Sequence, residues 1–361
     1  MAVRIEAALT DPLEARLVPR ERAGLRIGLV VPQSGALGMV GPSAVDAALL
    51  ATHEVNVAGG VRGAYVDLVL VDGGRRPRVV AEEVEALCRS GAVDALVGFH
   101  TSDVHRALEA TVGGRTPYVF TPPHEGGRRR AGVVCIGADP ARQLRAAIRW
   151  LTAEHGLRRW AMVGNDYIWP RSVHRCATLL VAGSGAEAVL DRLVPLGAVD
   201  AWSDRLVDDL RASRADAVLL SLVGRDLVAF HRVLRQAGLD RRLVRLSGAL
   251  EENGLLAADG DRTGTLYAAM PSFASMTDER HLGLVERHAA LLGTRAPVLD
   301  TYAEGVYDGL HLVARLAGEG ALRPDRIGRA AARAVEVERT TRVLLARADG
   351  LGLSVVPGVA S

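Results

Sequence analysis

The chain contains no lysine, because all 44 of its basic residues are arginine. This absence rules out a P-loop, whose lysine contacts the nucleotide phosphates. The sequence also contains no G-x-S-x-G and no H-E-x-x-H pattern, so the usual signatures of serine hydrolases and zinc proteases are missing. We therefore predict a non-catalytic protein without a cofactor. An enzyme would need a nucleophile–base pair, for which the sequence offers only His100 or His124.

Cysteine is scarce, with Cys88, Cys135 and Cys176 far apart in the sequence. Their odd number and wide spacing match neither a disulfide framework nor a metal site. We predict three free thiols, and no metal ligands.

Long apolar runs are absent too. No continuous apolar stretch approaches the roughly 18 residues that a membrane span needs, and the charged first 24 residues lack the apolar segment of a secretory signal. Taken as complete, the chain is expected to be cytoplasmic, without membrane insertion. If a signal peptide has been removed, the expectation changes to periplasmic or extracellular.

The overall composition is that of an ordinary globular protein, with 49% hydrophobic and 24% charged residues. A net charge of +2 gives no general attraction to nucleic acid. The arginine runs at 75–78 and 128–130 have no interleaved aromatic residues, so we interpret them as solvated loops and predict no direct nucleic-acid contact. A length of 361 residues indicates two domains.

Short apolar runs alternate with longer helical patterns along the whole chain. Apolar runs of four to six residues that are bounded by Gly, Pro, Asp and Ser are typical of parallel strands covered on both faces. The alternation recurs too often for one sheet. The sequence therefore predicts an α/β protein with two doubly wound parallel sheets.

The first such unit predicts a strand over 25–32, a Gly-rich loop over 33–42, a helix over 43–55, a turn over 56–63 and a strand over 65–71. The glycine spacing in the loop does not fit a dinucleotide fingerprint. In open α/β sheets, a loop that follows a strand and precedes a helix is where a small ligand usually binds. We expect this loop to face a ligand.

Small polar or aromatic residues recur where the predicted strands end. Each one alone is consistent with a turn or a helix N-cap, but the carboxyl ends of parallel strands meet at one edge of a sheet. Tyr167 and Trp169 are prominent because only 4% of the residues are aromatic, and they could cover an apolar ligand. The predicted ligand-binding residues are Ser34, His100, Thr101, Ser102, Phe120, Thr121, Tyr167, Trp169, Ser221 and Glu251.

Several sequence stretches resemble the type I periplasmic-binding-protein family, which includes branched-chain amino-acid receptors. The resemblance is closest to the cytoplasmic amide-sensing regulator of aliphatic amidase expression, and it extends to about Ala317. The matching stretches are Asn56-x-x-Gly59-Gly60-Val61-x-Gly63, Leu96-Val97-Gly98 with Ser102, Pro123-His124-Glu125-Gly126, Gly164-Asn165-Asp166-Tyr167-Ile168-Trp169-Pro170-Arg171, and Arg214-Ala215-Asp216-Ala217.

The resemblance implies two lobes joined by three crossings, with a ligand clamped between them. It adds Pro122 and Phe273 to the predicted ligand contacts. His100, Pro122 and Trp169 depart from the amide sensor, so the ligand could differ. The expected divisions are an N-terminal extension over 1–24, lobe 1 over 25–137 and 271–335, and lobe 2 over 138–270 and 336–361.

Two functions follow from this resemblance. The main hypothesis is a cytoplasmic sensor of a small amide-like or amino-acid-like ligand, which signals by lobe closure to a regulatory protein. The alternative is the substrate-binding receptor of an ABC importer for branched-chain amino acids, amides or urea. A nitrile-derived ligand and a homodimer also remain open. A Glu251 carboxylate available to the ligand would favour an amino acid, whose ammonium group needs an anion.

Overall fold

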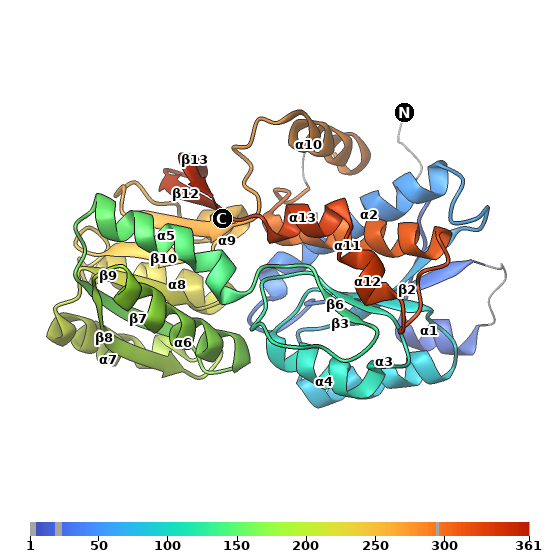
Figure 1. Ribbon diagram of the computed structural model, residues 1–361, viewed down its shortest axis with the longest axis horizontal. Coiled ribbons are helices and arrows are strands. Elements are labelled where there is room, and N and C mark those ends of the chain that lie inside the picture. Colours follow the sequence, from blue (N-terminus) through green and yellow to red (C-terminus); the bar gives the residue numbers. More distant parts are fainter. Residues whose placement is uncertain (1–4, 19–23, 294–295, 361) are drawn as a thin grey trace. The chain divides into compact units, whose positions relative to one another are not determined.

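The computed structural model describes residues 5–18, 24–293 and 296–360 and contains two compact units (Figure 1). Unit 1 comprises Met1–Pro122, Gly127–Gly137 and Asp278–Thr341. Unit 2 comprises Pro123–Gly126, Ala138–Thr277 and Arg342–Ser361. The chain thus passes repeatedly between the units, and each unit is assembled from segments that are distant in the sequence.

Unit 1 contains a six-stranded sheet in the order β1-β3-β2-β4-β5-β6, in which every neighbouring pair is parallel. The predicted N-terminal extension contributes to it, because β1 pairs with β3. The strands are β1 (Leu9–Thr10), β2 (Leu25–Val31), β3 (Val66–Asp72), β4 (Ala95–Gly98), β5 (Tyr118–Phe120) and β6 (Val133–Cys135).

Helices cover both faces of this sheet. α3 and α4 pack together on one face, whereas α2 and α11 pack together on the other. The helices are α1 (Pro12–Leu17), α2 (Gly41–Val57), α3 (Pro77–Arg89), α4 (Ser102–Val112), α10 (Glu279–Leu292), α11 (Thr301–Gly318), α12 (Ile327–Ala331) and α13 (Val335–Thr341), with a 3-10 turn, η1, at Gly38–Val40.

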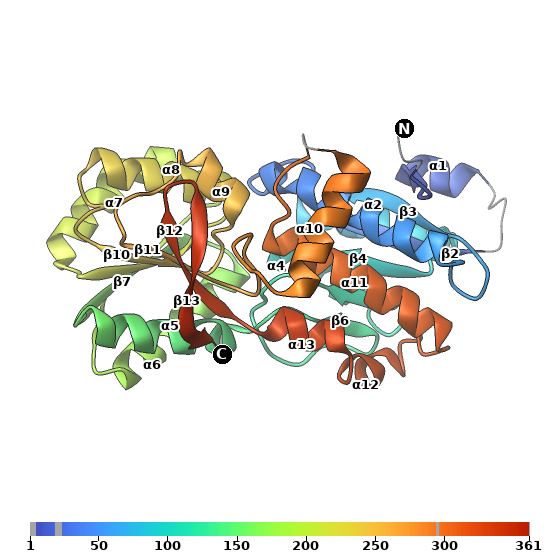
Figure 2. The same cartoon turned by 90° about the horizontal axis from the view of Figure 1, so that it is seen from above.

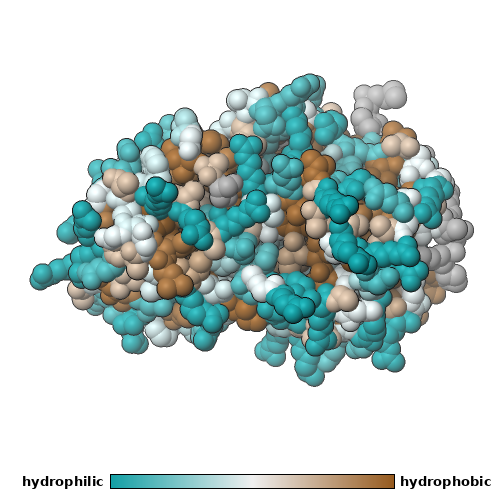
Figure 3. Space-filling view, viewed as in Figure 1, coloured by the Kyte–Doolittle hydropathy of each residue, from teal (hydrophilic) through white to brown (hydrophobic). Residues whose placement is uncertain are grey.

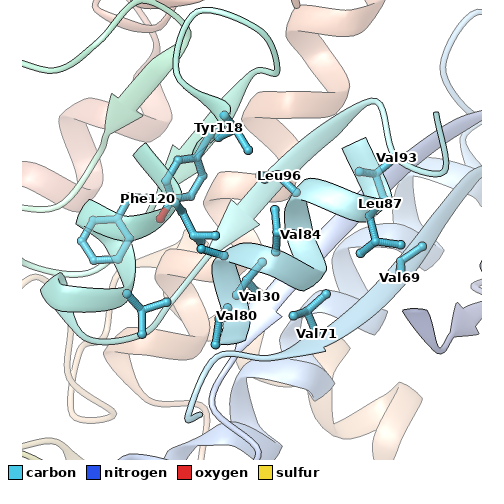
Figure 4. Close-up of a cluster of buried hydrophobic side chains, with 14 of the residues drawn as sticks. Val30, Val69, Val71, Val80, Val84, Leu87, Val93, Leu96, Tyr118 and Phe120 are labelled. Carbon is cyan, nitrogen blue, oxygen red and sulfur yellow. The ribbon is translucent and has the colours of Figure 1, made fainter. Parts of the chain in front are cut away.

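The core of unit 1 beneath α3 and α4 consists mainly of valine and leucine. Figure 4 shows Val80 and Val84 of α3 beside Val30 and Val71 of the sheet. All four are fully buried, and burying such side chains stabilises the fold by about 1.5–3 kcal/mol each. The apolar runs that predicted the strands are therefore buried strands, as expected for a parallel sheet.

Unit 2 contains a seven-stranded sheet in the order β13-β12-β11-β10-β9-β7-β8. The strands from β7 to β11 are parallel to their neighbours, but β12 is antiparallel to β11 and β13 is antiparallel to β12. The strands are β7 (Arg159–Asn165), β8 (Glu187–Val194), β9 (Ala217–Ser221), β10 (Val244–Ser247), β11 (Leu266–Met270), β12 (Leu344–Asp349) and β13 (Gly352–Ala360).

Helices also cover both faces of the second sheet. Figure 2 shows α5 and α6 on one side of the strands and α7, α8 and α9 on the other. Their bounds are α5 (Pro140–Glu154), α6 (Ile168–Gly183), α7 (Val199–Ser213), α8 (Gly224–Gln236) and α9 (Glu252–Ala257). The prediction of two α/β lobes is confirmed, with an antiparallel hairpin added to the parallel strands of unit 2.

The helical pattern of the sequence predicts a helix over 171–182, whereas α6 begins at Ile168, so Trp169 and Pro170 lie in its first turn. Proline is tolerated there because a first-turn N–H has no partner within the helix. The sequence pattern also predicts one helix over roughly 325–334. The structure has the shorter α12 (Ile327–Ala331) there, and α13 (Val335–Thr341) follows it. Among the described residues, no helix is long and apolar enough to cross a membrane.

Candidate ligand-binding site

The first predicted loop of unit 1 is held by the carboxylate that ends β3. The Ser34 hydroxyl donates to Asp72 Oδ2 at 2.7 Å, and the backbone N–H groups of Gln33 and Gly74 donate to Asp72 Oδ1, each at 2.8 Å. Burial raises the pKa of Asp72, but these hydrogen bonds outweigh it and leave the pKa below its ordinary value. Ser34 is exposed, and its proton is committed to Asp72, so it offers lone pairs to a ligand.

His100 follows β4 and ends a chain of hydrogen bonds. Its Nδ1 lies 3.1 Å from the Thr101 carbonyl oxygen, which can only accept, so Nδ1 carries the proton and Nε2 accepts from the Tyr118 hydroxyl at 3.1 Å. The Tyr118 oxygen then accepts from His105 Nδ1 at 3.0 Å, and His105 Nε2 accepts from the Cys135 thiol at 3.7 Å. We assign the His100 imidazole as neutral from this pattern.

The electrostatics of His100 agree with that assignment. Its side chain is buried, and burial lowers its pKa to about 4, although the contact with the Thr101 carbonyl acts in the opposite direction. The ring lies 5.1 Å, centroid to centroid, from Phe120 at the end of β5. Near neutral pH this part of unit 1 therefore presents an uncharged aromatic surface.

Thr121 and Ser102 lie at the same edge of this sheet. The Thr121 N–H donates to the Gly98 carbonyl at 2.9 Å, which ties the end of β5 to the end of β4. Ser102 is the first residue of α4 and is buried, and Thr101 is its N-cap without a side-chain cap bond. Three adjacent strands, β2, β4 and β5, thus have these predicted residues at or just after their ends: Ser34, His100, Thr101, Ser102, Phe120, Thr121 and Pro122.

In unit 2, Tyr167 and Trp169 open α6 directly after β7. Tyr167 is the N-cap, and its N–H donates to the Asn165 carbonyl at 3.0 Å. Trp169 is 4% exposed, and its indole N–H has no hydrogen-bond partner among the described residues. An unsatisfied buried donor costs about 1–3 kcal/mol. The Trp169 indole is therefore a donor that a ligand acceptor could satisfy.

Ser221 at the end of β9 belongs to a serine–histidine–aspartate trio that the sequence did not reveal. Its hydroxyl lies 2.8 Å from His174 Nε2, and His174 Nδ1 lies 2.6 Å from Asp191 Oδ1. This is the hydrogen-bond order of a nucleophile, a base and an orienting acid. Ser221 has no exposed surface, however, so in this structure a substrate could not reach its oxygen.

The remaining predicted residues of unit 2 follow β10 and β11. Glu251 is 3% exposed, and its carboxylate accepts from the N–H groups of Asn253 at 2.6 Å and Gly254 at 2.7 Å, so it caps α9. Phe273 is fully buried after β11. Four neighbouring strands, in the order β7, β9, β10 and β11, thus have these predicted residues at or after their ends: Tyr167, Trp169, Ser221, Glu251 and Phe273.

The two histidines considered for catalysis, His100 and His124, both make hydrogen bonds to the backbone. His124 Nδ1 accepts from the Gly126 N–H at 3.0 Å, a contact within one turn. His100 contacts Tyr118 and the Thr101 carbonyl. No group of three metal-ligating side chains occurs within residues 5–18, 24–293 and 296–360. The assignment of the twelve predicted residues to a ligand site stays a prediction.

Solved structures with the same fold cover almost the whole chain. A branched-chain amino acid transporter substrate-binding protein from Streptococcus pneumoniae, in complex with isoleucine, has a TM-score of 0.74 and 18% identity over 92% of this chain and 99% of that chain. A fatty acid ABC transporter substrate-binding protein from Thermomonospora curvata has a TM-score of 0.79 and 16% identity over 94% of this chain and 92% of its own.

A third structure carries an aromatic ligand. The solute-binding protein of an ABC transporter from Rhodopseudomonas palustris BisB5, in complex with 3,4-dihydroxybenzoic acid, has a TM-score of 0.74 and 17% identity over 94% of this chain and 97% of its own. At these identities the three structures establish the fold alone. The family model described as periplasmic binding protein matches residues 24–343. With its two α/β units, the chain therefore belongs to the periplasmic binding protein family.

Proposed function

We propose that this protein is the solute-binding component of an importer and binds a small organic molecule at the strand ends described above. Family membership supports this role, and so do the relatives described as ABC transporter substrate-binding proteins. In this proposal the solute stabilises a closed arrangement of the two units, and the protein works outside the cytoplasm. Binding shifts such an equilibrium only through contacts that differ between the two states.

The chemistry of the proposed contacts defines the class of ligand. None of the twelve residues is a lysine or arginine, and His100 is neutral because of its low pKa. The Glu251 carboxylate already accepts two backbone N–H groups, which weakens the expectation of an amino-acid ammonium contact. We propose a solute with an apolar or aromatic body and a hydrogen-bond-accepting head, such as an amide or a carboxylate.

The unpartnered indole N–H of Trp169 is the observation that carries this proposal. A native protein seldom leaves a buried donor without a partner, and a ligand acceptor would supply one. Trp169 also offers a large apolar ring. One side chain could therefore cover the body of the solute and hold its polar head.

A screen of defined compounds tests the proposal. Branched-chain amino acids, short aliphatic amides, urea and benzoates are titrated while the thermal midpoint and the tryptophan fluorescence are recorded, because a ligand that binds only the folded state raises the midpoint. Trp169→Phe should abolish or weaken the response, whereas Trp202→Phe in α7 is a matched control that should retain it. The proposal fails if none of these classes binds, or if both variants respond alike.

A sensor role is the second candidate, and the run from Asp166 to Arg171 favours it because this run matches the amide-sensing regulator. In this case the same ligand would change the affinity of the protein for a regulatory protein in the cytoplasm. The two roles are separated by location. Fractionation of cells that express the native gene would find the protein outside the cytoplasm for the importer role and inside it for the sensor role.

A further inference from the structure

Helix α11 contacts three of the parts of unit 1 through which the chain enters or leaves, namely β5, α10 and α13. The chain leaves unit 1 after Pro122, after Gly137 and after Thr341, and it returns at Gly127 and at Asp278. The residues nearest these points lie on β5, β6, α10 and α13. We call the ends of these four elements that lie nearest the exit and return points the bases of the crossings. A contact between α11 and one of them is a contact with such a base.

One side of α11 lies against the end of β5. A Cβ placed on Gly309 would lie 2.8 Å from Thr121 Cγ2, and one placed on Gly305 would lie 3.6 Å from Thr121 Cβ. The glycines thus let the helix backbone approach the residue that precedes the first crossing. Thr121 is also one of the proposed ligand contacts, so this side of α11 contacts both the proposed site and a crossing.

An acidic residue of α11, Asp308, binds both α10, which follows the return at Asp278, and α13, which precedes the exit after Thr341. Asp308 Oδ1 accepts from Arg280 Nη2 at 2.8 Å and from Arg339 Nη2 at 2.6 Å. Arg280 lies at the start of α10, just after the return at Asp278, and Arg339 lies near the end of α13, just before the exit at Thr341. Asp308 is 2% exposed, whereas the side chains of Arg280 and Arg339 are 35% and 29% exposed, so solvent screens these ion pairs in part.

Neighbouring residues extend the same connection. Glu304, one turn before Asp308, lies 3.1 Å from His281 Nδ1 of α10. The Thr340 hydroxyl of α13 donates to the Ile136 carbonyl at 2.6 Å, next to the exit after Gly137. The bases of the crossings are thus joined to one another through α11 and α13. Figure 1 shows α11 and α13 side by side. In the same view, Figure 3 shows mainly hydrophilic residues over α12, the short helix between them in the sequence.

We propose that Asp308 is a positioning residue for the movement between the two units. By holding Arg280 and Arg339 on one carboxylate, it keeps the bases of two crossings in a fixed relation, so the crossings bend together and not independently. The same helix contacts Thr121, and a ligand at Thr121 would therefore be coupled to the crossings without touching Asp308. The expected effect of Asp308 on the affinity for a solute rests on the proposed binding function, whereas its expected effect on the movement between the two units does not.

The test compares two variants that each remove one buried carboxylate from the same helix pair. Asp308→Asn loses the ion pairs to α10 and α13. Glu336→Gln is the matched control, because Glu336 joins α13 to Arg315 of α11 at 2.8 Å, lies 6% exposed and has no contact with α10 among the described ion pairs. Both replacements keep the shape of the side chain, and circular dichroism verifies folding.

The readout is the distance between one spin label on each unit, measured without ligand. Cys88, Cys135 and Cys176 are replaced by serine, and cysteines are introduced at Val79 and Leu179, which are 38% and 75% exposed. Asp308→Asn should broaden or shift the distance distribution relative to the parent. Glu336→Gln leaves the ion pairs of Asp308 with α10 and α13 in place, so it should change the distribution less. Equal distributions in the parent and Asp308→Asn would overturn the proposal, as would equal changes in both variants.

Two further measurements keep the test decisive. If Asp308→Asn fails to fold, Arg280→Gln and Arg339→Gln each remove one donor, and the proposal then requires a changed distribution in at least one of them. If a solute has been identified, Asp308→Asn should change its apparent Kd by about 2- to 30-fold, the range expected for residues that act on coupling. Absence of binding in the parent would refute the proposed function but not the distance result.

Discussion

Gly164 of β7 provides a sharp test of how the Ser221–His174–Asp191 trio is packed. A Cβ at this position would lie 2.1 Å from Ser221 Oγ, 2.9 Å from His174 Nε2 and 3.1 Å from Pro170 Cβ. Real Cβ atoms do not approach other atoms at 2.1 Å. Gly164→Ala must therefore displace the Ser221 hydroxyl and break its hydrogen bond to His174.

The expected cost follows from three contributions. Overpacking costs about 1–3 kcal/mol, and loss of a buried hydrogen bond costs about 1–3 kcal/mol. Replacing a strand glycine by alanine returns about 0.5–1 kcal/mol of backbone entropy. Gly164→Ala should therefore lower the free energy of unfolding by about 1–5 kcal/mol.

A double-mutant cycle separates the steric contact from general damage to β7. Ser221→Ala alone should cost about 1–3 kcal/mol, because His174 Nε2 loses its donor. In the double variant the displaced oxygen is absent, so its total cost should be close to that of Ser221→Ala. The interaction energy between the two sites should therefore equal the cost of Gly164→Ala, about 1–5 kcal/mol, in the favourable direction.

Urea unfolding followed by tryptophan fluorescence measures these values in one unit. All four tryptophans, Trp150, Trp160, Trp169 and Trp202, belong to unit 2. Gly183→Ala is the control, because no atom lies within 4 Å of its added Cβ at the end of α6, so it should be neutral or stabilising. If the costs of Gly164→Ala and Ser221→Ala add to within about 0.5 kcal/mol, the reasoning is refuted.

Three further predictions concern buried polar groups. Tyr118→Phe should destabilise unit 1 by about 1–3 kcal/mol, because the Tyr118 hydroxyl contacts both His100 and His105; faster amide exchange in β4 and β5 checks this, and unchanged exchange contradicts it. Burial lowers the pKa of His231 in the folded protein to about 3, so as the pH falls the unfolded chain takes up this proton before the folded protein does. The free energy of unfolding should therefore fall by roughly 1.4 kcal/mol per pH unit below about pH 6.5. His231→Leu should weaken this pH dependence, which urea titrations at pH 7 and 4.5 measure. Asp261→Asn should lower the free energy of unfolding by about 3–5 kcal/mol, because Asp261 pairs with the buried Arg245 at 2.9 Å. The control is Asp209→Asn, which removes the partly exposed pair of Asp209 with Arg192. It should lower the free energy of unfolding less in the same fluorescence assay.

Some of the site could be predicted from the sequence because it depends on local patterns. Apolar runs bounded by Gly and Pro correctly predicted most strands, and polar residues after them correctly marked the strand ends. The start of α6 could not be predicted, because Pro170 suggests a break unless it lies in a first turn. Glu251 illustrates the same limit, since only its contacts with Asn253 and Gly254 identify it as a helix cap.

The sequence by itself determined the absence of a P-loop, the two-unit α/β architecture and the family resemblance, because composition and apolar period are properties of neighbouring residues. Only the tertiary structure decided which distant groups meet. Ser221 meets His174 and Asp191 because α6 packs on β7 and β8, and β9 lies next to β7 in the sheet. Asp308 meets Arg280 and Arg339 because α11 lies against α10 and α13. Such contacts depend on strand order and helix packing, which no local pattern encodes.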